Sequence, residues 1–204
     1  MFTTPRLIAI ALCAALNFAV GAVVYLVKLP IYMESIGTIL CAMLIFPDRW
    51  AAFVCALIAG LASVAVIGLL VNPFLPWFSL TVLAIALISA FVTATGDGVY
   101  RARPPQLLAF VVRVVLFGVL TGVVAAIVSA PVVAYLFGGV TGSGSAFLVA
   151  FFLKTGETLM RSVLWSGLTA DPIDKVLQVL IAALLFRATP AEFIDMVRGV
   201  PAKA

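Results

Sequence analysis

Six long apolar runs, separated by short breaks rich in proline, glycine and charge, limit the folds open to this chain. The runs lie near residues 7–27, 31–46, 51–71, 76–95, from 107 onward, and 173–187. An α-helix needs about 20 apolar residues to cross the hydrocarbon layer of a membrane, and most of these runs approach that length. We therefore predict an all-α integral membrane protein, with a single bundle of six transmembrane helices over residues 1–204.

The composition points to the same class of protein. Hydrophobic residues make up 65% of the 204 residues, charged residues 10%, and the mean hydropathy is +1.31. Soluble domains are typically about half apolar and about a quarter charged. The first run has about the 20 residues that a span needs and no small-residue cleavage site interrupts it, so we expect a span and not a signal peptide. The second run is short for a layer of ~30 Å, so we expect neighbouring helices to shield it, or its start to lie below the membrane surface.

Within residues 129–170, glycines and charged residues interrupt the apolar sequence. A lipid-exposed helix over 146–168 would place three charged side chains near its middle, at a cost of several kcal/mol. We predict instead a capping or re-entrant segment between the fifth and sixth helices, on the outer side. On one helix Lys154, Glu157 and Arg161 would share a stripe, where they either neutralise one another or contact a ligand.

The basic residues predict the orientation. With the N-terminus in the cytoplasm, eight of the 12 Lys and Arg residues fall on the inner side and four on the outer side. The inner residues are Arg6, Arg49, Arg101, Arg103, Arg113, Arg187, Arg198 and Lys203, and the outer ones are Lys28, Lys154, Arg161 and Lys175. By the positive-inside rule both termini are then cytoplasmic. The net charge of +4 reflects this orientation, and we expect no nucleic-acid partner.

The stretch 191-AEFIDMVRGV-200 alternates apolar and charged residues at helical spacing. We predict a short amphipathic helix over about residues 190–200, lying on the inner membrane interface. No internal repeat and no second domain stand out in the sequence.

Polar and aromatic residues gather at the predicted outer ends of the helices. Such groups in apolar walls are typical of a pocket for a small polar or aromatic molecule. The alternative is that the aromatics belong to an interface belt and the charges are solvated loop residues. The candidate substrate-binding residues are Lys28, Tyr32, Glu34, Asn72, Trp77, Lys154, Glu157, Arg161, Trp165 and Asp174.

Glu34 is the sharpest of these candidates, because the run after it stays apolar as far as Pro47. Its carboxylate must reach the outer water, pair with a cation such as Lys28, or hold the donors of a ligand. Asp174 and Lys175 pose the same problem. Adjacent residues point about 100° apart on a helix, so we expect at most one of these two to face the interior.

Catalytic and metal-binding chemistry finds little support. The chain has no histidine, and Cys13, Cys41 and Cys55 lie inside apolar runs without a CxxC pair. This excludes most zinc, haem and histidine-based chemistry, so we expect no cofactor, no metal and no enzymatic activity. A small intramembrane enzyme stays open as an alternative, although the missing histidine counts against it.

Small residues recur every four positions on two of the predicted helices. Ala11, Ala15 and Ala19 form one strip on the first helix, and Ala52, Ala56 and Gly60 form another on the third. Such strips let a second helix approach closely. Either internal packing or docking of a partner subunit explains them.

Several stretches together resemble the S component, the substrate-binding membrane subunit of energy-coupling factor (ECF) vitamin transporters. They are 9-AIALCAALN-17, 29-LPIYMESIGTILCAML-44, 71-VNPFLPWFSL-80, 137-FGGVTGSGS-145 and 171-DPIDKVLQVLIAALL-185. The resemblance covers most of the chain.

This resemblance implies six transmembrane helices with both termini inside, in a prokaryotic cytoplasmic membrane. It implies a vitamin or vitamin-precursor ligand held beneath the outer loops, and partnership with a transmembrane T component and cytoplasmic ATPase subunits. The docking motif of the family would fall on Ala11 and Ala15. An alternative function is a membrane sensor or interaction module that signals through its cytoplasmic tail.

Overall fold

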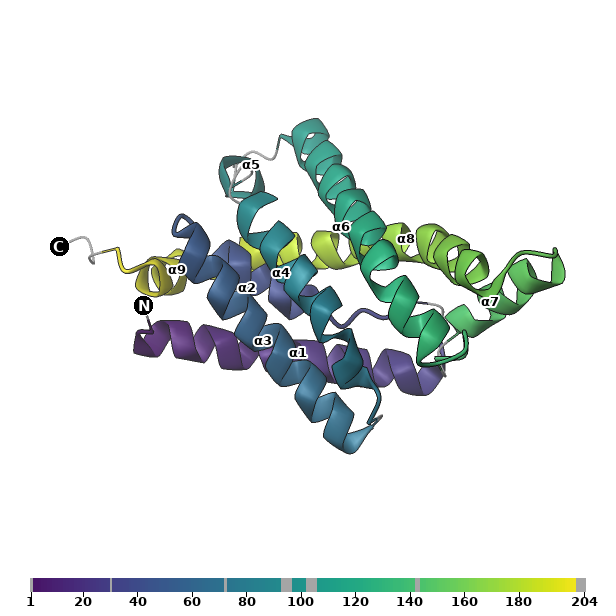
Figure 1. Cartoon of the computed structure of the whole chain (residues 1–204). Coiled ribbons are helices and arrows are strands. Elements are labelled where there is room, and N and C mark those ends of the chain that lie inside the picture. The colour runs from purple at the N-terminus through teal and green to yellow at the C-terminus, as the bar shows by residue number, and fades with distance from the viewer. Residues whose placement is uncertain are drawn as a thin grey trace.

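The computed structural model of the chain describes residues 2–29, 31–71, 73–92, 97–101, 106–141 and 144–200, and every regular element in them is a helix (Figure 1). The elements are α1 (Thr4–Val27), α2 (Ile36–Ile45), α3 (Arg49–Leu70), η1 (Leu75–Phe78), α4 (Ser79–Val92), α5 (Asp97–Arg101), α6 (Leu107–Tyr135), α7 (Ser145–Lys154), α8 (Leu159–Ala188) and α9 (Ala191–Arg198). The all-α prediction is confirmed for these ranges. Asn72, Arg103 and Lys203, on which parts of the sequence analysis rely, lie outside the described residues.

Long apolar helices dominate the fold. In the described residues four units are long and apolar enough to cross a membrane, namely α1, α3, α6 and the unit Leu75–Val92. The pair α8 and α9, bent by 102° at a short break, brings the number to five. The sequence predicts six crossings, so length and composition support four or five of them.

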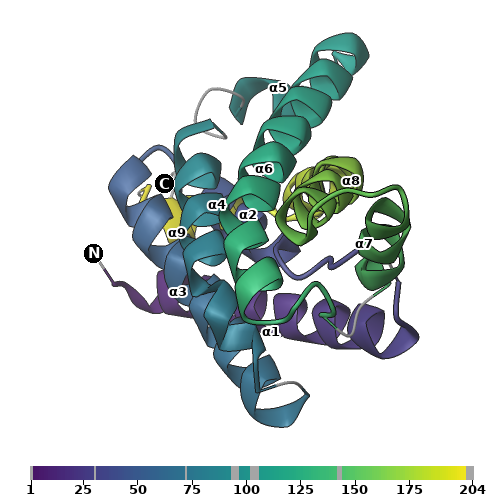
Figure 2. The same ribbon diagram turned by 45° about the vertical axis from the view of Figure 1, so that its right-hand side comes forward.

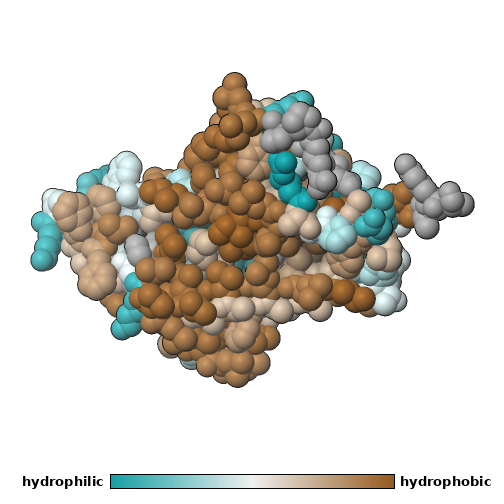
Figure 3. All heavy atoms as spheres, turned by 180° about the vertical axis from the view of Figure 1, so that it is seen from behind, coloured by the Kyte–Doolittle hydropathy of each residue, from teal (hydrophilic) through white to brown (hydrophobic). Residues whose placement is uncertain are grey.

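The surface of the bundle is apolar in its middle. Large side chains on the long helices point outward, such as Leu69, which is 85% exposed, and Leu108, which is 79% exposed. In Figure 3 apolar residues cover the centre of the visible face, and hydrophilic residues gather mainly toward its two ends. Soluble monomers rarely expose an apolar surface of this extent. The helices and this surface are those of a multi-pass membrane protein.

The short helix α2 lies in the core of the bundle. All ten of its residues are buried, and it packs against α1, α3, α4 and α8. Ten residues of α-helix span about 15 Å, half of the ~30 Å hydrocarbon layer. The prediction that neighbouring helices shield this run is confirmed.

Helices α6 and α8 approach closely through glycines on α6. A Cβ atom at Gly118 would overlap the backbone of Val176, and one at Gly122 would overlap the backbone of Pro172. Pro172 stays inside α8, as prolines do in membrane helices whose neighbours support the backbone.

The segment before the last helix differs from its prediction. The sequence predicts a last helix that begins near residue 173 and a separate cap over 146–168. Instead, α7 ends at Lys154 and the 30-residue helix α8 begins at Leu159, beside α7 (Figure 2). Gly156, with a φ of 91°, makes the turn between them, a backbone conformation that favours glycine. The expected start near residue 173 is wrong, because α8 continues through Pro172, for which Gly122 leaves room.

Helix α9 folds back against the bundle at the end where the chain begins (Figure 1). Arg6 in α1 donates a hydrogen bond of 3.0 Å from Nε to the carbonyl of Val197. Arg198 donates to the carbonyls of Leu44 at 3.2 Å and Met43 at 3.0 Å, in the last turn of α2. Carbonyls at a helix end have no partner within the helix, so Arg198 caps α2. The predicted tail helix exists, and its apolar face packs on protein through Ile194 and Val197.

Candidate substrate-binding site

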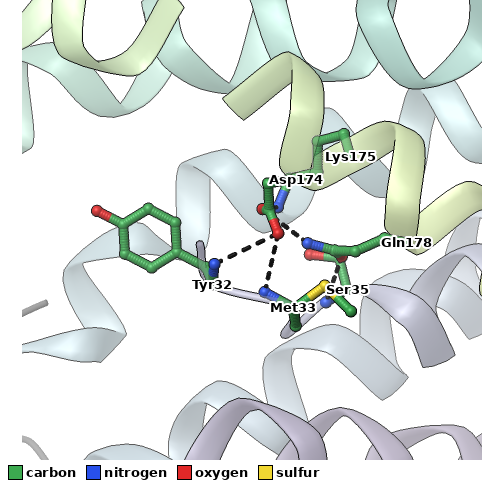
Figure 4. A network of polar contacts seen from close by, with 6 residues as sticks. All are labelled: Tyr32, Met33, Ser35, Asp174, Lys175 and Gln178. Carbon is green, nitrogen blue, oxygen red and sulfur yellow. Dashed lines mark hydrogen bonds and ion pairs between the residues drawn. The ribbon is translucent and has the colours of Figure 1, made fainter. Parts of the chain in front are cut away.

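The segment that joins α1 to α2 is half-buried over residues 31–34 and buried at Ser35, and Asp174 of α8 holds it (Figure 4). The carboxylate Oδ1 of Asp174 accepts hydrogen bonds from the backbone amides of Tyr32 at 3.3 Å and Met33 at 3.2 Å. Buried backbone amides need such partners, because an unpaired one costs about as much as a lost hydrogen bond. Asp174 therefore fixes the path of the chain into α2.

Met33, which donates one of these hydrogen bonds, takes an unusual backbone conformation. Its φ is 55°, in the left-handed region that residues other than glycine rarely adopt. The amide of Met33 and that of Tyr32 before it both donate to one oxygen of Asp174. Non-glycine residues in this region persist where the surrounding structure holds them, and they concentrate at functional sites.

Two further side chains of α8 complete the contact, and we call Asp174, Lys175 and Gln178 the polar clasp. The Lys175 ammonium lies 2.8 Å from Asp174 Oδ2, which also accepts a 2.8 Å hydrogen bond from the Gln178 amide. The other amide atom of Gln178, Oε1, accepts from the backbone amide of Ser35 at 2.9 Å. All three clasp residues are buried.

The clasp overturns one expectation. At most one of Asp174 and Lys175 was expected to face the interior, yet they are 0% and 2% exposed. Around Asp174 and Lys175, one side of α8 packs against α6 and another side contacts the α1–α2 segment. Both side chains are therefore surrounded by protein. The Lys175 ammonium then reaches the carboxylate of its neighbour.

On the opposite side of the α1–α2 segment, α1 supplies a second polar anchor. Asn17 accepts a 2.6 Å hydrogen bond from the amide of Gly37 and donates one of 2.9 Å to the hydroxyl of Thr38. Both contacts lie in the first turn of α2, where helical amides lack partners within the helix. A Cβ atom at Gly37 would collide with the backbone carbonyl of Cys13, so α1 and α2 meet at this glycine.

A cavity of about 70 Å³ lies beside the clasp. It is lined by residues of the α1–α2 segment, α3, η1, α4, α6, α7 and α8. A single water needs about 10–15 Å³, and pockets that enclose a drug-sized ligand hold about 300 Å³ or more. The cavity therefore admits a compact ligand, and a larger one requires its walls to move.

The cavity has apolar walls and a few polar groups. Aliphatic side chains from α3, α4, α6, α7 and α8 form most of the surface, among them Val64, Ile85, Val133, Val149 and Val163. The polar lining comprises Tyr32, Glu34, Thr81, Ser129, Ser145, Ser166, Asp171 and Lys175. This mixture is the usual make-up of a small-molecule site, in which apolar walls give affinity and placed polar groups give orientation.

Tyr32 links this lining to α7. Its ring points away from the clasp (Figure 4), and its hydroxyl lies 2.8 Å from the hydroxyl of Ser145 at the start of α7. Ser166 of α8 donates a 3.3 Å hydrogen bond to the carbonyl of Ser145. Three segments far apart in sequence are thus joined at one edge of the cavity.

The predicted site residues fall into two groups. Tyr32 and Glu34 line the cavity, and Asp174 supports it from the clasp. Lys28, Trp77 and Trp165 are exposed and do not line it, and Asn72 lies outside the described residues.

The predicted charge stripe does not form on one helix. Lys154 is the last residue of α7, Glu157 lies in the turn, and Arg161 is in the first turn of α8. Arg161 and Glu157 approach to 3.8 Å, with the Arg161 side chain 71% exposed. None of the three lines the cavity. The expectation of a shared helical stripe is wrong, because the chain turns at Gly156.

The predicted set omits several residues that the structure brings to the cavity. Asp171, Lys175, Thr81 and Ser145 all line it. A signal for part of this group is present in the sequence. Asp171, Asp174, Lys175 and Gln178 recur at intervals of three and four in an otherwise apolar helix, which marks one polar face turned toward protein.

The two small-residue strips have different environments. Ala52, Ala56 and Gly60 of α3 are buried within the bundle, so internal packing explains them. In contrast, Ala11, Ala15 and Ala19 of α1 are exposed.

No protein-family model, curated protein or solved structure matches the chain. Among the described residues no group of three or more Cys, Asp and Glu side chains is placed to hold a metal ion. The fold and the surface define a multi-pass helical membrane protein with an internal, partly charged cavity.

Proposed function

We propose that this protein is the substrate-capture subunit of an ECF-type importer, which binds a vitamin-like or vitamin-precursor-like small molecule in the cavity beside the clasp. The observation that carries the proposal is the cavity itself. It combines apolar walls with Glu34, Asp171 and Lys175 inside a bundle of membrane helices. Charged groups at membrane depth are costly, and they are usually kept for a substrate or ion pathway.

The proposed topology has six crossings with both termini in the cytoplasm. Two crossings add to the four long units: α2 with the extended segment before it, and α8. The contact between Arg6 and Val197 supports an even number, because it joins the first turn of α1 to α9. The turn at Gly156 would then face the outside.

The proposed partners are a transmembrane T component and cytoplasmic ATPase subunits. The exposed strip of Ala11, Ala15 and Ala19 supports docking of another helix on α1, because small residues permit close approach within a membrane. The chain itself would hydrolyse nothing, and the ATPase partners would supply the energy. The proposed location is a prokaryotic cytoplasmic membrane.

Mass spectrometry of the molecule that co-purifies with the full chain tests this function. Wild-type protein should carry one small molecule in near-stoichiometric amount, and Glu34→Gln should lose most of it. Glu192→Gln is the matched control, because Glu192 is an exposed residue of α9 far from the cavity. Equal retention in Glu34→Gln and wild type would contradict the proposed site.

A second candidate function is a sensor that signals through its cytoplasmic tail. The hydrogen bonds from Arg198 to the end of α2 favour it, because they tie α9 to the helix that begins beside the cavity. Arg198→Gln should increase hydrogen exchange in α9. If a soluble partner binds wild type and Arg198→Gln with different affinities in the absence of a small molecule, the result favours the sensor function and not the transport function.

A further inference from the structure

Negative charge exceeds positive charge around the cavity. Glu34 and Asp171 line it, and Asp174, which does not line it, pairs with Lys175 at 2.8 Å. Among the described residues that line the cavity, Lys175 is the one cation, and it interacts electrostatically with all three carboxylates. With every group ionised, three negative charges face one positive charge.

The single cation is already engaged. Lys175 Nζ lies 2.8 Å from Asp174 Oδ2 and donates a hydrogen bond to it, and Asp174 in turn holds the α1–α2 segment. A ligand carboxylate or phosphate would have to compete with this contact and would meet Glu34 and Asp171 as like charges. The cavity is therefore poorly suited to an anion.

Asp171 faces the cavity without a partner of its own. It is 7% exposed, and within the described part of the chain its carboxylate makes no hydrogen bond and no ion pair. Glu34, half-buried, has none there either. A buried carboxylate is expensive unless it is paired and hydrogen-bonded, so a partner from outside the chain would stabilise both.

An independent group on another wall points to the same space. Thr81 of α4 lines the cavity and is 8% exposed, and its hydroxyl has no hydrogen-bond partner. Buried hydroxyls nearly always have a partner, and an unsatisfied one is often explained by a group that the structure does not contain. A ligand that donates to the carboxylates can also bond this hydroxyl, which both donates and accepts.

The walls define the rest of the ligand. Aliphatic side chains from five helices surround the polar groups, which suits a hydrocarbon body and not a bare ion. No described set of three or more acidic or cysteine side chains is arranged for a metal ion. A compact molecule with an apolar body and a positively charged nitrogen meets all of these features.

We propose that the cavity selects small organic ammonium compounds, whose charged nitrogen is held by Asp171 and Glu34 and whose apolar body lies against the aliphatic walls. The inference rests on the proposed capture function and names the ligand class for that site. Thr81 supplies a further hydrogen bond, and the clasp keeps Lys175 from repelling the ligand.

Three probes with one branched four-carbon skeleton test the charge preference: isobutylamine, isobutanol and isobutyrate. The full chain is placed in lipid nanodiscs at pH 7, and each Kd is measured by saturation-transfer NMR with the signal of empty nanodiscs subtracted. The amine should bind at least about tenfold more tightly than the alcohol and the carboxylate. Equal binding of the alcohol, or tighter binding of the carboxylate, would overturn the inference.

Variants assign the preference to the carboxylates. Asp171→Asn should reduce the preference for the amine to within about threefold, and Glu34→Gln should reduce it in the same direction. Glu192→Gln, on exposed α9, should keep the wild-type preference. The comparison of the three probes on wild-type protein stands without the variants, so a variant that does not fold leaves the inference testable.

Identifying the co-purified molecule shows whether the ammonium preference alone is wrong or the capture function is wrong as well. A co-purified compound with a basic or quaternary nitrogen supports both. A co-purified compound without one overturns the ammonium preference and leaves the capture function standing. If nothing co-purifies and none of the three probes binds, both proposals fail together.

Discussion

The carboxylate of Asp174 lies 3.2 Å from the backbone amide of Met33 and accepts its hydrogen bond, although 141 residues separate the two along the chain. This contact joins α8 to the segment that leads into α2. The same α8 surface supplies Asp171 and Lys175 to the cavity. The clasp thus shapes the candidate site and also holds the core helix in place.

Removing one member of the clasp should destabilise the protein strongly. Asp174→Ala leaves the Lys175 ammonium buried without its carboxylate and frees the amides of Tyr32 and Met33. Breaking a buried ion pair in this way costs about 3–5 kcal/mol. We expect a clear fall in the apparent Tm of Asp174→Ala in detergent.

The double variant Asp174→Asn with Lys175→Met is the informative control. It removes both charges together, so its loss of stability should be smaller than the summed losses of Asp174→Asn alone and Lys175→Met alone. Additive losses would show that the two side chains do not act as a pair.

Gly37 should tolerate no larger residue. In Gly37→Ala the new Cβ would overlap the backbone carbonyl of Cys13, which cannot move without shifting α1. Overpacking of a core typically costs about 1–3 kcal/mol. Gly98→Ala is the matched control, since a Cβ atom there meets nothing within 4 Å. In thermal unfolding in detergent, Gly37→Ala should have a lower Tm than Gly98→Ala. Equal Tm values would contradict the close contact between α1 and α2.

The exposed strip on α1 should control assembly and not ligand binding. Ala11→Trp or Ala15→Trp should abolish co-purification with a T component, because a large side chain blocks close helix approach. Retention of the co-purified small molecule should be unchanged. Ala56→Trp, on the buried strip of α3, should instead unfold the bundle. A complex that survives both α1 substitutions would remove the docking role.

The topology can be tested with reporter fusions. A reporter after residue 200 should be active in the cytoplasm, and one inserted at Gly156 should report an external position. The two sites lie toward opposite ends of the bundle, with α9 at one end and the α7–α8 turn at the other (Figure 1). A cytoplasmic signal at Gly156 would contradict the proposed orientation and the outer access of the ligand.

Much of the helical framework follows from hydropathy alone. Backbone polar groups in a membrane must be paired within the segment, so an apolar run of sufficient length forms a helix. This accounts for α1 and α3, whose bounds lie close to the predicted runs, and for the start of α6 at Leu107. The burial of α2 was also predictable, because its run is too short to cross a membrane by itself.

The site was harder to predict, because it depends on contacts between distant segments. The local sequence does not predict the left-handed conformation of Met33. Its hydrogen-bond partner Asp174 lies in α8, far away in the sequence. The continuation of α8 before residue 173 is equally hard to predict, because Gly122, the glycine of α6 that accommodates Pro172, lies 50 residues earlier in the chain. Two local signals point to the site: the carboxylate of Glu34 ahead of an apolar run, and the spacing of polar residues from Asp171 to Gln178.

An experimental structure of wild-type protein bound to its co-purified ligand tests the central claim most directly. The account predicts ligand density in the cavity, with a charged nitrogen within hydrogen-bond distance of Asp171 and Glu34. Density near the exposed Trp77, or beside Lys154 at the α7–α8 turn, with the cavity empty would contradict it.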